Sequence, residues 1–141
     1  MTIGIDPDVD KSGVAVKEGG EYRLYSLSFW DLFEFLSQAR PKMVKIEGGW
    51  LNAKSNFRFA NSTSIASRMG KNVGENHSVG KKIVEMCVYL KLDHEVVKPL
   101  QKVWKGKDGK ITHEEVVKHF KINKKKTNQE ERDALLLVTS S

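Results

Sequence analysis

Four carboxylates occupy positions from which they can converge and bind a metal ion. Asp6 closes a short apolar strand at the start of the chain, and Glu47 closes a second one. Glu130 and Asp133 lie three residues apart in the last predicted helix, so they project from one face of it. Oxygen donors of this kind suit Mg²⁺ or Mn²⁺. Two such ions can activate water and stabilise the leaving oxygen of a phosphodiester, so the pattern predicts a nuclease site.

The elements that would position Asp6 are strands. The apolar runs 2–6 and 14–16 flank a polar turn containing proline and glycine, which predicts a β-hairpin. Because side chains alternate along a strand, Asp6 shares one face with Gly4, and the isoleucines of this strand share the other. Alternating apolar and polar residues over 22–27 predict a third strand.

A helix is predicted after the third strand. Ser28 can cap its first turn, apolar residues recur at helical spacing over 29–36, and Pro41 lies beyond its end. Trp30 and Phe35 fall outside this apolar stripe. We expect both to be partly buried under a loop.

Glu47 closes the fourth predicted strand, which covers 43–47 and is followed by two glycines. A strand–helix–strand unit of this kind forms a right-handed crossover between parallel strands. The fourth strand can therefore lie beside the first and point the same way. Asp6 and Glu47 would then emerge at the same edge of the sheet.

The middle of the chain changes from a polar stretch without periodicity to one whose apolar residues recur at helical spacing. Residues 52–74 are polar with little periodicity, which predicts a loop with a short helix over 62–69. The stretch 76–92 has a clear apolar helical face. A fifth strand is predicted over 94–98, stopped by Pro99.

Two further helices are predicted near the C-terminus. They follow a basic, glycine-containing segment over 101–110. Thr112 and Glu115 form a capping box for a helix ending at Phe120, and the last helix covers 127–138. Apolar residues continue the face that carries the two acids of the last helix, so this face must pack on the sheet. Acids on a packed face are costly unless something neutralises them, and a divalent metal would do so.

Several of the acids also have a purely structural interpretation. Asp6 can be a turn-forming acid. Asp8 and Asp10 resemble a calcium loop, but lysine stands where glycine and glutamate are required, so both are assigned to the turn. Glu130 can form a capping box with Thr127. The joint placement of the acids favours the metal site.

Length and charge restrict the class of protein. The 141 residues predict one domain over 1–141, an α/β fold with a mixed five-stranded sheet flanked by helices. In this sheet three antiparallel strands precede parallel strands four and five. A formal charge of +6 favours a polyanionic partner, nucleic acid before membrane. No apolar run approaches the ~20 residues that span a bilayer. A lone Cys87 and no signal-peptide pattern predict a cytoplasmic protein.

The motifs and their order resemble the RuvC-type Holliday junction resolvases of the RNase H-like superfamily. GIDP at 4–7 and SGVAV at 12–16 look like the first hairpin of that family, and Glu47 matches its second acid. EERDAL at 130–135 resembles its closing Asp-x-x-Asp-Ala-Leu. Residues 102–116 resemble its basic loop and following helix. The resemblance covers nearly the whole chain.

The resemblance implies an RNase H-like fold and an endonuclease that cuts four-way DNA junctions in recombination and repair. It implies two Mg²⁺ ions per active site, with Mn²⁺ able to substitute, and a homodimer formed through the helix that starts at Asn76. The catalytic and metal-binding residues would be Asp6, Glu47, Glu130 and Asp133. The DNA-binding residues would be Trp50, Lys102, Lys105, Lys107, Lys110 and His113.

Four positions carry alternatives or depart from the family pattern. Trp50 stands where the family has an aromatic residue that separates bases, but it can also be a core tryptophan under the loop. His113 replaces a lysine and can be simply an exposed helix residue. Asp8 replaces a glycine, and Glu130 replaces an aspartate.

Two other classes of protein stay open. One is a different RNase H-like nuclease acting on branched DNA or RNA. The other is a non-catalytic protein that binds junctions, against which the intact acids Asp6, Glu47 and Asp133 argue.

Overall fold

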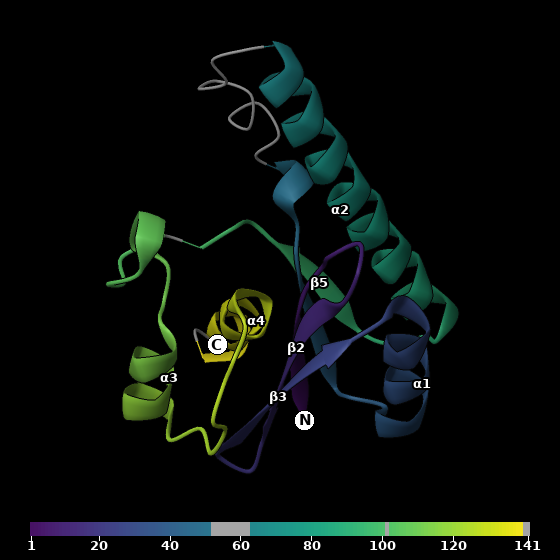
Figure 1. Ribbon diagram of the computed structural model, residues 1–141. Helices are drawn as coiled ribbons and strands as arrows, with labels where there is room; N and C mark the ends of the chain where they lie inside the picture. The colour runs from purple at the N-terminus through teal and green to yellow at the C-terminus, as the bar shows by residue number, and fades with distance from the viewer. Residues whose placement is uncertain (52–62, 101, 140–141) are drawn as a thin grey trace.

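The computed structural model describes residues 1–51, 63–100 and 102–139. Its sheet has five strands in the order β3-β2-β1-β4-β5 (Figure 1). The strands are β1 (Thr2–Asp6), β2 (Ser12–Glu18), β3 (Glu21–Leu27), β4 (Met43–Glu47) and β5 (His94–Val97). The first three are antiparallel neighbours, whereas β4 pairs parallel with both β1 and β5. This is the mixed sheet predicted from the sequence.

The predicted crossover places β4 beside β1. Helix α1 (Phe29–Ala39) connects β3 to β4, and the hydroxyl of Ser28 accepts a hydrogen bond from the backbone N–H of Asp31, as an N-cap does. In the parallel register Ile5 lies opposite Ile46, so the acids that follow these residues leave the sheet at one edge.

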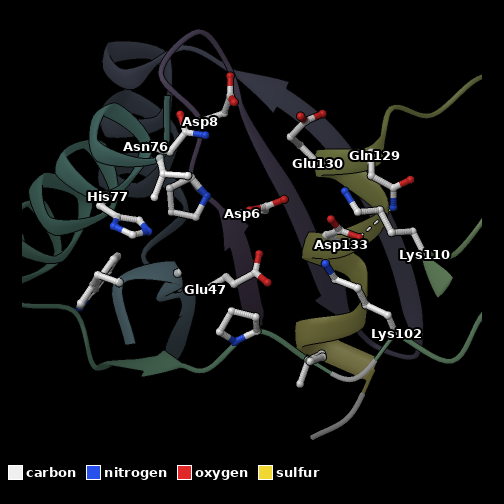
Figure 2. A pocket seen from close by; sticks show the side chains of 16 residues that line it. Asp6, Asp8, Glu47, Asn76, His77, Lys102, Lys110, Gln129, Glu130 and Asp133 are labelled. Carbon is white, nitrogen blue, oxygen red and sulfur yellow. Dashed lines mark hydrogen bonds between the residues drawn. The ribbon is translucent and has the colours of Figure 1, made fainter. Parts of the chain in front are cut away.

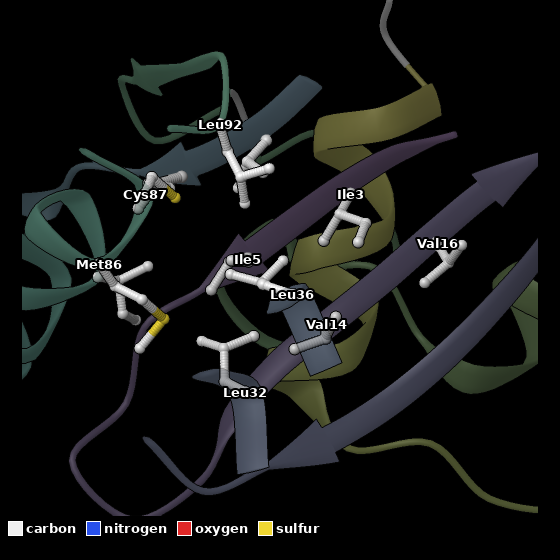
Figure 3. Close-up of a cluster of buried hydrophobic side chains, with 12 residues drawn as sticks. Ile3, Ile5, Val14, Val16, Leu32, Leu36, Met86, Cys87 and Leu92 are labelled. Carbon is white, nitrogen blue, oxygen red and sulfur yellow. The ribbon is translucent and has the colours of Figure 1, made fainter. Parts of the chain in front are cut away.

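The two faces of the sheet pack against different helices. The face with Ile3 and Ile5 forms a buried cluster with α1 and with α2 (Thr63–Tyr89), and Figure 3 shows part of this cluster. The opposite face packs against α3 (His113–Phe120) and α4 (Gln129–Thr139). Since Gly4 and Asp6 are on this second face, Asp6 faces the helix that carries Glu130 and Asp133.

Glycine at position 4 permits close contact between α4 and the sheet. A Cβ built on Gly4 would lie 2.5 Å from the carbonyl oxygen of Ala134 and 3.1 Å from the Cβ of Leu137. A Cβ on Gly13 of β2 would overlap the backbone of Glu130. The two glycines therefore let the helix lie directly on the strands, which brings its acids within reach of Asp6.

Helix α2 is much longer than predicted. It begins at Thr63, so the short helix expected over 62–69 is helical from Thr63 onward and the prediction of a loop is wrong over 70–74; residues 52–62 lie outside the described part of the chain. The predicted apolar face of its second half is confirmed, with Ile83 and Cys87 fully buried. Because extending an existing helix costs less than starting one, this anchored half can support a first half that is mostly polar and contains glycine. In Figure 1 the first half projects beyond the sheet.

The predictions for two aromatic residues of α1 need correction. Trp30 is 70% exposed, so the expectation of partial burial is wrong, and its ring contacts Phe29 and Phe33. Phe35 is partly buried, but its ring packs against Tyr25 of β3 and not under a loop.

The remaining predicted elements are confirmed with small changes at their ends. Thr112 and Glu115 form the predicted capping box of α3. A short 3₁₀ turn, η2 (Lys107–Gly109), interrupts the basic loop. No helix in the described ranges has both the length and the apolar character needed to cross a membrane.

Candidate nuclease site

Asp6 and Glu47 lie at the ends of two neighbouring parallel strands. They follow Ile5 and Ile46, which lie opposite each other in the register of β1 and β4. Burial of the Asp6 carboxyl group raises its pKa well above the ordinary value, and the neighbouring charge of Glu47 raises it further. The Asp6 carboxyl group therefore holds a proton more tightly than an isolated aspartic acid would.

Helix α4 brings two further acids to this pair. Glu130 and Asp133 line the same pocket as Asp6 and Glu47, which has a volume of about 680 Å³ (Figure 2). Both helix acids add to the upward shift of the Asp6 pKa, so their negative charges act on the same carboxyl group. The predicted convergence of all four acids is confirmed as geometry.

Glu130 does not cap its helix. The reciprocal capping bonds lie one residue further along, between Asn128 and Glu131: each backbone N–H donates to the side chain of the other at 2.8–2.9 Å. Glu131 also pairs with the ammonium group of Lys124. The alternative interpretation of Glu130, a capping box with Thr127, is therefore wrong. The carboxylate of Glu130 lines the pocket instead.

Two lysines of the basic loop reach the site. Lys102 and Lys110 line the pocket, and Figure 2 shows both beside Asp133. Burial raises the pKa of Asp133, whereas a hydrogen bond from Gln129 and the charges of the two lysines lower it. Asp133 therefore lies between the other acids of the pocket and the two lysines. Such an arrangement suits a metal ion held by the acids next to a phosphate held by the lysines.

Three of the predicted DNA-binding residues lie away from the pocket, although all are within the described ranges. Lys105 and Lys107 are exposed on the basic loop, and the backbone N–H of Lys105 donates to Glu115. The ring of His113 is partly buried, with Nδ1 2.9 Å from the hydroxyl oxygen of Thr127. The interpretation of His113 as a simply exposed helix residue is therefore wrong, and the structure does not place it beside the acids.

Trp50 connects the site to α2. Its ring packs on Gly80, where a Cβ would collide with it, and lies 6.2 Å from the ring of His77 between centroids. It is partly buried at the margin of the core and also lines the pocket. Trp50 therefore combines both predicted environments, since one part packs on the helix and another faces the open space.

The turn after Asp6 is held by its own acids and by α2. The backbone N–H of Asp10 donates to the Asp8 carboxylate at 3.1 Å, which fits the predicted turn role. The N–H of Val9 donates to the side chain of Asn76 at 2.9 Å. In Figure 2 Asp8 points away from the other acids, although it lines the pocket rim.

Three polar residues of the pocket lining were not predicted from the sequence. Asn76 and His77 come from α2, and their approach to the β1–β2 turn is a tertiary contact without a local signal. Gln129 donates to Asp133 at 2.8 Å. Its position four residues before Asp133 on one helix is a signal that could have identified it.

The chemistry of the donor set fits a hard divalent cation. All four acids offer carboxylate oxygens, and burial together with the negative charges of the other three raises the pKa of Asp6, a strain that a cation would relieve. As the side chains of the described residues stand, no group of three or more His, Cys, Asp or Glu is arranged to hold an ion. The prediction of a metal site therefore depends on donor type and location, and not on preformed coordination.

The sheet order and its covering helices define an RNase H-like fold. No protein-family model matches the chain, and no curated protein matches it either. Solved structures do. The chain is similar to Thermus thermophilus RuvC in complex with a Holliday junction substrate, with a TM-score of 0.56 and 16% identity over 96% of this chain and 88% of that one.

A second Thermus thermophilus RuvC structure gives a TM-score of 0.55 and 18% identity, covering 96% of this chain and 89% of that chain. At this level of identity the likeness establishes the fold. It confirms the resemblance predicted from the sequence motifs at the level of architecture, over nearly the whole length of both chains.

Proposed function

We propose that this protein is a Holliday junction resolvase, a nuclease that hydrolyses DNA phosphodiesters at four-way junctions in recombination and repair. The observation that carries the proposal is the convergence of Asp6, Glu47, Glu130 and Asp133 in one open pocket with lysines at its edge. The RuvC-like fold and the net charge of +6 support a nucleic-acid substrate.

Asp6, Glu47 and Asp133 would hold two Mg²⁺ ions, with Glu130 beside them and Mn²⁺ able to substitute. Such ions supply an activated water and neutralise charge on the phosphate and its leaving oxygen. A bound cation would favour the ionised form of Asp6, because it neutralises the charge that burial and the neighbouring acids disfavour.

The basic residues would hold the DNA backbone in this mechanism. Lys102 and Lys110 would contact the phosphate next to the cut, since they border Asp133. The exposed Lys105 and Lys107 would contact phosphates further away, which positions the duplex without reading its sequence. His113, whose ring is hydrogen-bonded to Thr127, would contact the DNA backbone from the surface that the basic loop and α3 form. Trp50 would stack on an unpaired base at the junction centre, worth about 1–3 kcal/mol.

We also propose a homodimer formed through α2, because a four-way junction has two-fold symmetry and needs paired cuts. Two apolar residues near the end of this helix support an interface, since Val88 is 63% and Tyr89 77% exposed. The cytoplasm, together with its DNA, is the proposed location.

The experiment is a comparison of substrates in Mg²⁺. Four-way junctions, flaps, linear duplex and RNA–DNA hybrid are incubated with wild type and with Asp6→Asn. The proposal expects wild type to cut the junction in preference and Asp6→Asn to bind it without cutting. Equal cleavage of flaps or hybrid would instead favour another RNase H-like nuclease. Binding without cleavage by wild type would indicate a non-catalytic junction-binding protein.

A further inference from the structure

A chain of hydrogen bonds behind the candidate site ends on Asp133. The side-chain amide of Gln129 donates from Nε2 to Oδ1 of Asp133 at 2.8 Å. Both residues are on α4, one turn apart and partly buried, and Figure 2 shows the bond as a dashed line. One oxygen of Asp133 thus has a fixed partner.

Arg132 fixes the orientation of the Gln129 amide. Its Nη2 donates to Oε1 of Gln129 at 3.0 Å. A guanidinium group only donates hydrogen bonds, so the amide must present its oxygen to Arg132 and its N–H group to Asp133. The direction of the hydrogen bond to Asp133 is therefore determined by Arg132.

The same two side chains hold the loop that carries the lysines. Arg132 Nε donates to the backbone carbonyl of Ile111 at 3.0 Å, and Gln129 Nε2 lies 3.4 Å from the same oxygen. Arg132 also donates to the carbonyl and hydroxyl of Thr127. Ile111 follows Lys110 directly, so the basic loop and Asp133 are fixed against a common pair of residues.

We propose that Gln129 is a positioning residue for Asp133, and that Arg132 acts on Asp133 through Gln129. This inference rests on the proposed metal-dependent function. With one carboxylate oxygen engaged by Gln129, Asp133 keeps the other for a cation and is held in one rotamer. Groups that orient metal ligands in this way commonly change metal affinity or activity by about 10–100-fold when they are removed.

A purely structural role makes a different prediction. If the bond between Gln129 and Asp133 only supported the helix, its loss would lower stability slightly, because side-chain pairs four residues apart on a helix contribute little. Metal affinity would then stay unchanged. Metal affinity measured without DNA therefore separates the two roles. Gln129→Met is the main variant because methionine has nearly the same shape and cannot donate the hydrogen bond. Gln38→Met, on the exposed end of α1, is the matched control.

The experiment titrates Mn²⁺ into DNA-free protein and follows free Mn²⁺ by electron paramagnetic resonance. We expect Gln129→Met to weaken Mn²⁺ binding about 10-fold or more, with the control unchanged and thermal unfolding of both close to wild type. Arg132→Lys keeps the charge but loses the forked geometry, and it should also weaken binding. Because both residues act through one bond, the double variant should be little worse than Gln129→Met alone.

The inference would be overturned if Mn²⁺ affinity were the same in wild type, Gln129→Met and Arg132→Lys. It would also be overturned if none of the three bound Mn²⁺. Junction cleavage is measured separately on the same proteins. Wild type that binds Mn²⁺ but cuts no junction would overturn the proposed function, while the Mn²⁺ titration would still decide the role of Gln129.

Discussion

Gly4→Ala tests whether close contact between α4 and the sheet positions the acids. The change adds one methyl group on the face of β1 that also carries Asp6. The new Cβ would lie 2.5 Å from the carbonyl oxygen of Ala134 and 3.1 Å from carbons of Leu137 and Val138. The obstacle is helix backbone, which cannot turn aside as a flexible side chain can.

The displacement of the helix sets the size of the effect. Ordinary carbon contacts begin near about 3.5 Å, so α4 must retreat by roughly 1 Å. Overpacking of this kind costs about 1–3 kcal/mol, and alanine returns about 0.5–1 kcal/mol of glycine's conformational entropy. The expected net loss in free energy of unfolding is up to about 2.5 kcal/mol. A 1 Å misplacement of Asp133 and Glu130 can also slow cleavage about 100-fold.

The assay combines urea unfolding with single-turnover junction cleavage in Mg²⁺. Gly74→Ala is the control: Gly74 lies in α2 with nothing within 4 Å of an added Cβ, so alanine should stabilise the protein by about 0.5–1 kcal/mol. Gly4→Ala with the stability and cleavage rate of wild type would refute the claim that close helix–sheet contact positions the site.

Three other predictions concern single side chains. Asp6→Asn should abolish cleavage in Mg²⁺ and leave junction binding intact. Because the folded-state pKa of Asp6 lies above its unfolded value of about 3.9, metal-free wild type should lose stability as pH rises from there through the raised pKa. Asp6→Asn should therefore have a higher melting temperature than metal-free wild type at pH 7 and the same melting temperature near pH 3. Equal melting temperatures at pH 7 would contradict the raised pKa of Asp6. Trp50→Ala should slow cutting of intact junctions more than of junctions with an opened centre; equal slowing would argue against base stacking. Lys107→Ala should weaken binding to all sequences alike and lower the slope of log affinity against log salt by about 0.9; an unchanged slope would remove Lys107 from the phosphate contacts.

Local signals in the sequence were sufficient for most elements. Ser28 and the capping box of Thr112 mark helix starts because capping satisfies backbone groups within one turn. Asp6 and Glu47 were placed at strand ends because apolar runs stop there. The parallel pairing of their strands followed from the handedness of crossovers.

Local signals failed where packing at a distance decides the outcome. The first half of α2 has polar residues and glycines, so its helical structure depends on the anchored second half. The sequence suggested Thr127 as the cap of α4, whereas the contacts of the folded chain place the cap at Asn128. Lys102 and Lys110 reach the pocket while Lys105 does not, because the path of the basic loop is set by its contacts with α3 and α4.

The sequence by itself determined the types of side chain at the site, the elements that carry them and the order of those elements. These properties depend on periodicity, capping and chain handedness, which act over a few residues or one crossover. Only the tertiary structure decided how closely α4 approaches β1 at Gly4, which raises the pKa of Asp6 by burial and neighbouring charge. It also decided that Gln129 and Arg132 stand behind Asp133. Such contacts join residues distant in the chain or depend on side-chain orientation, which a local pattern such as the four-residue spacing of Gln129 and Asp133 permits but does not specify.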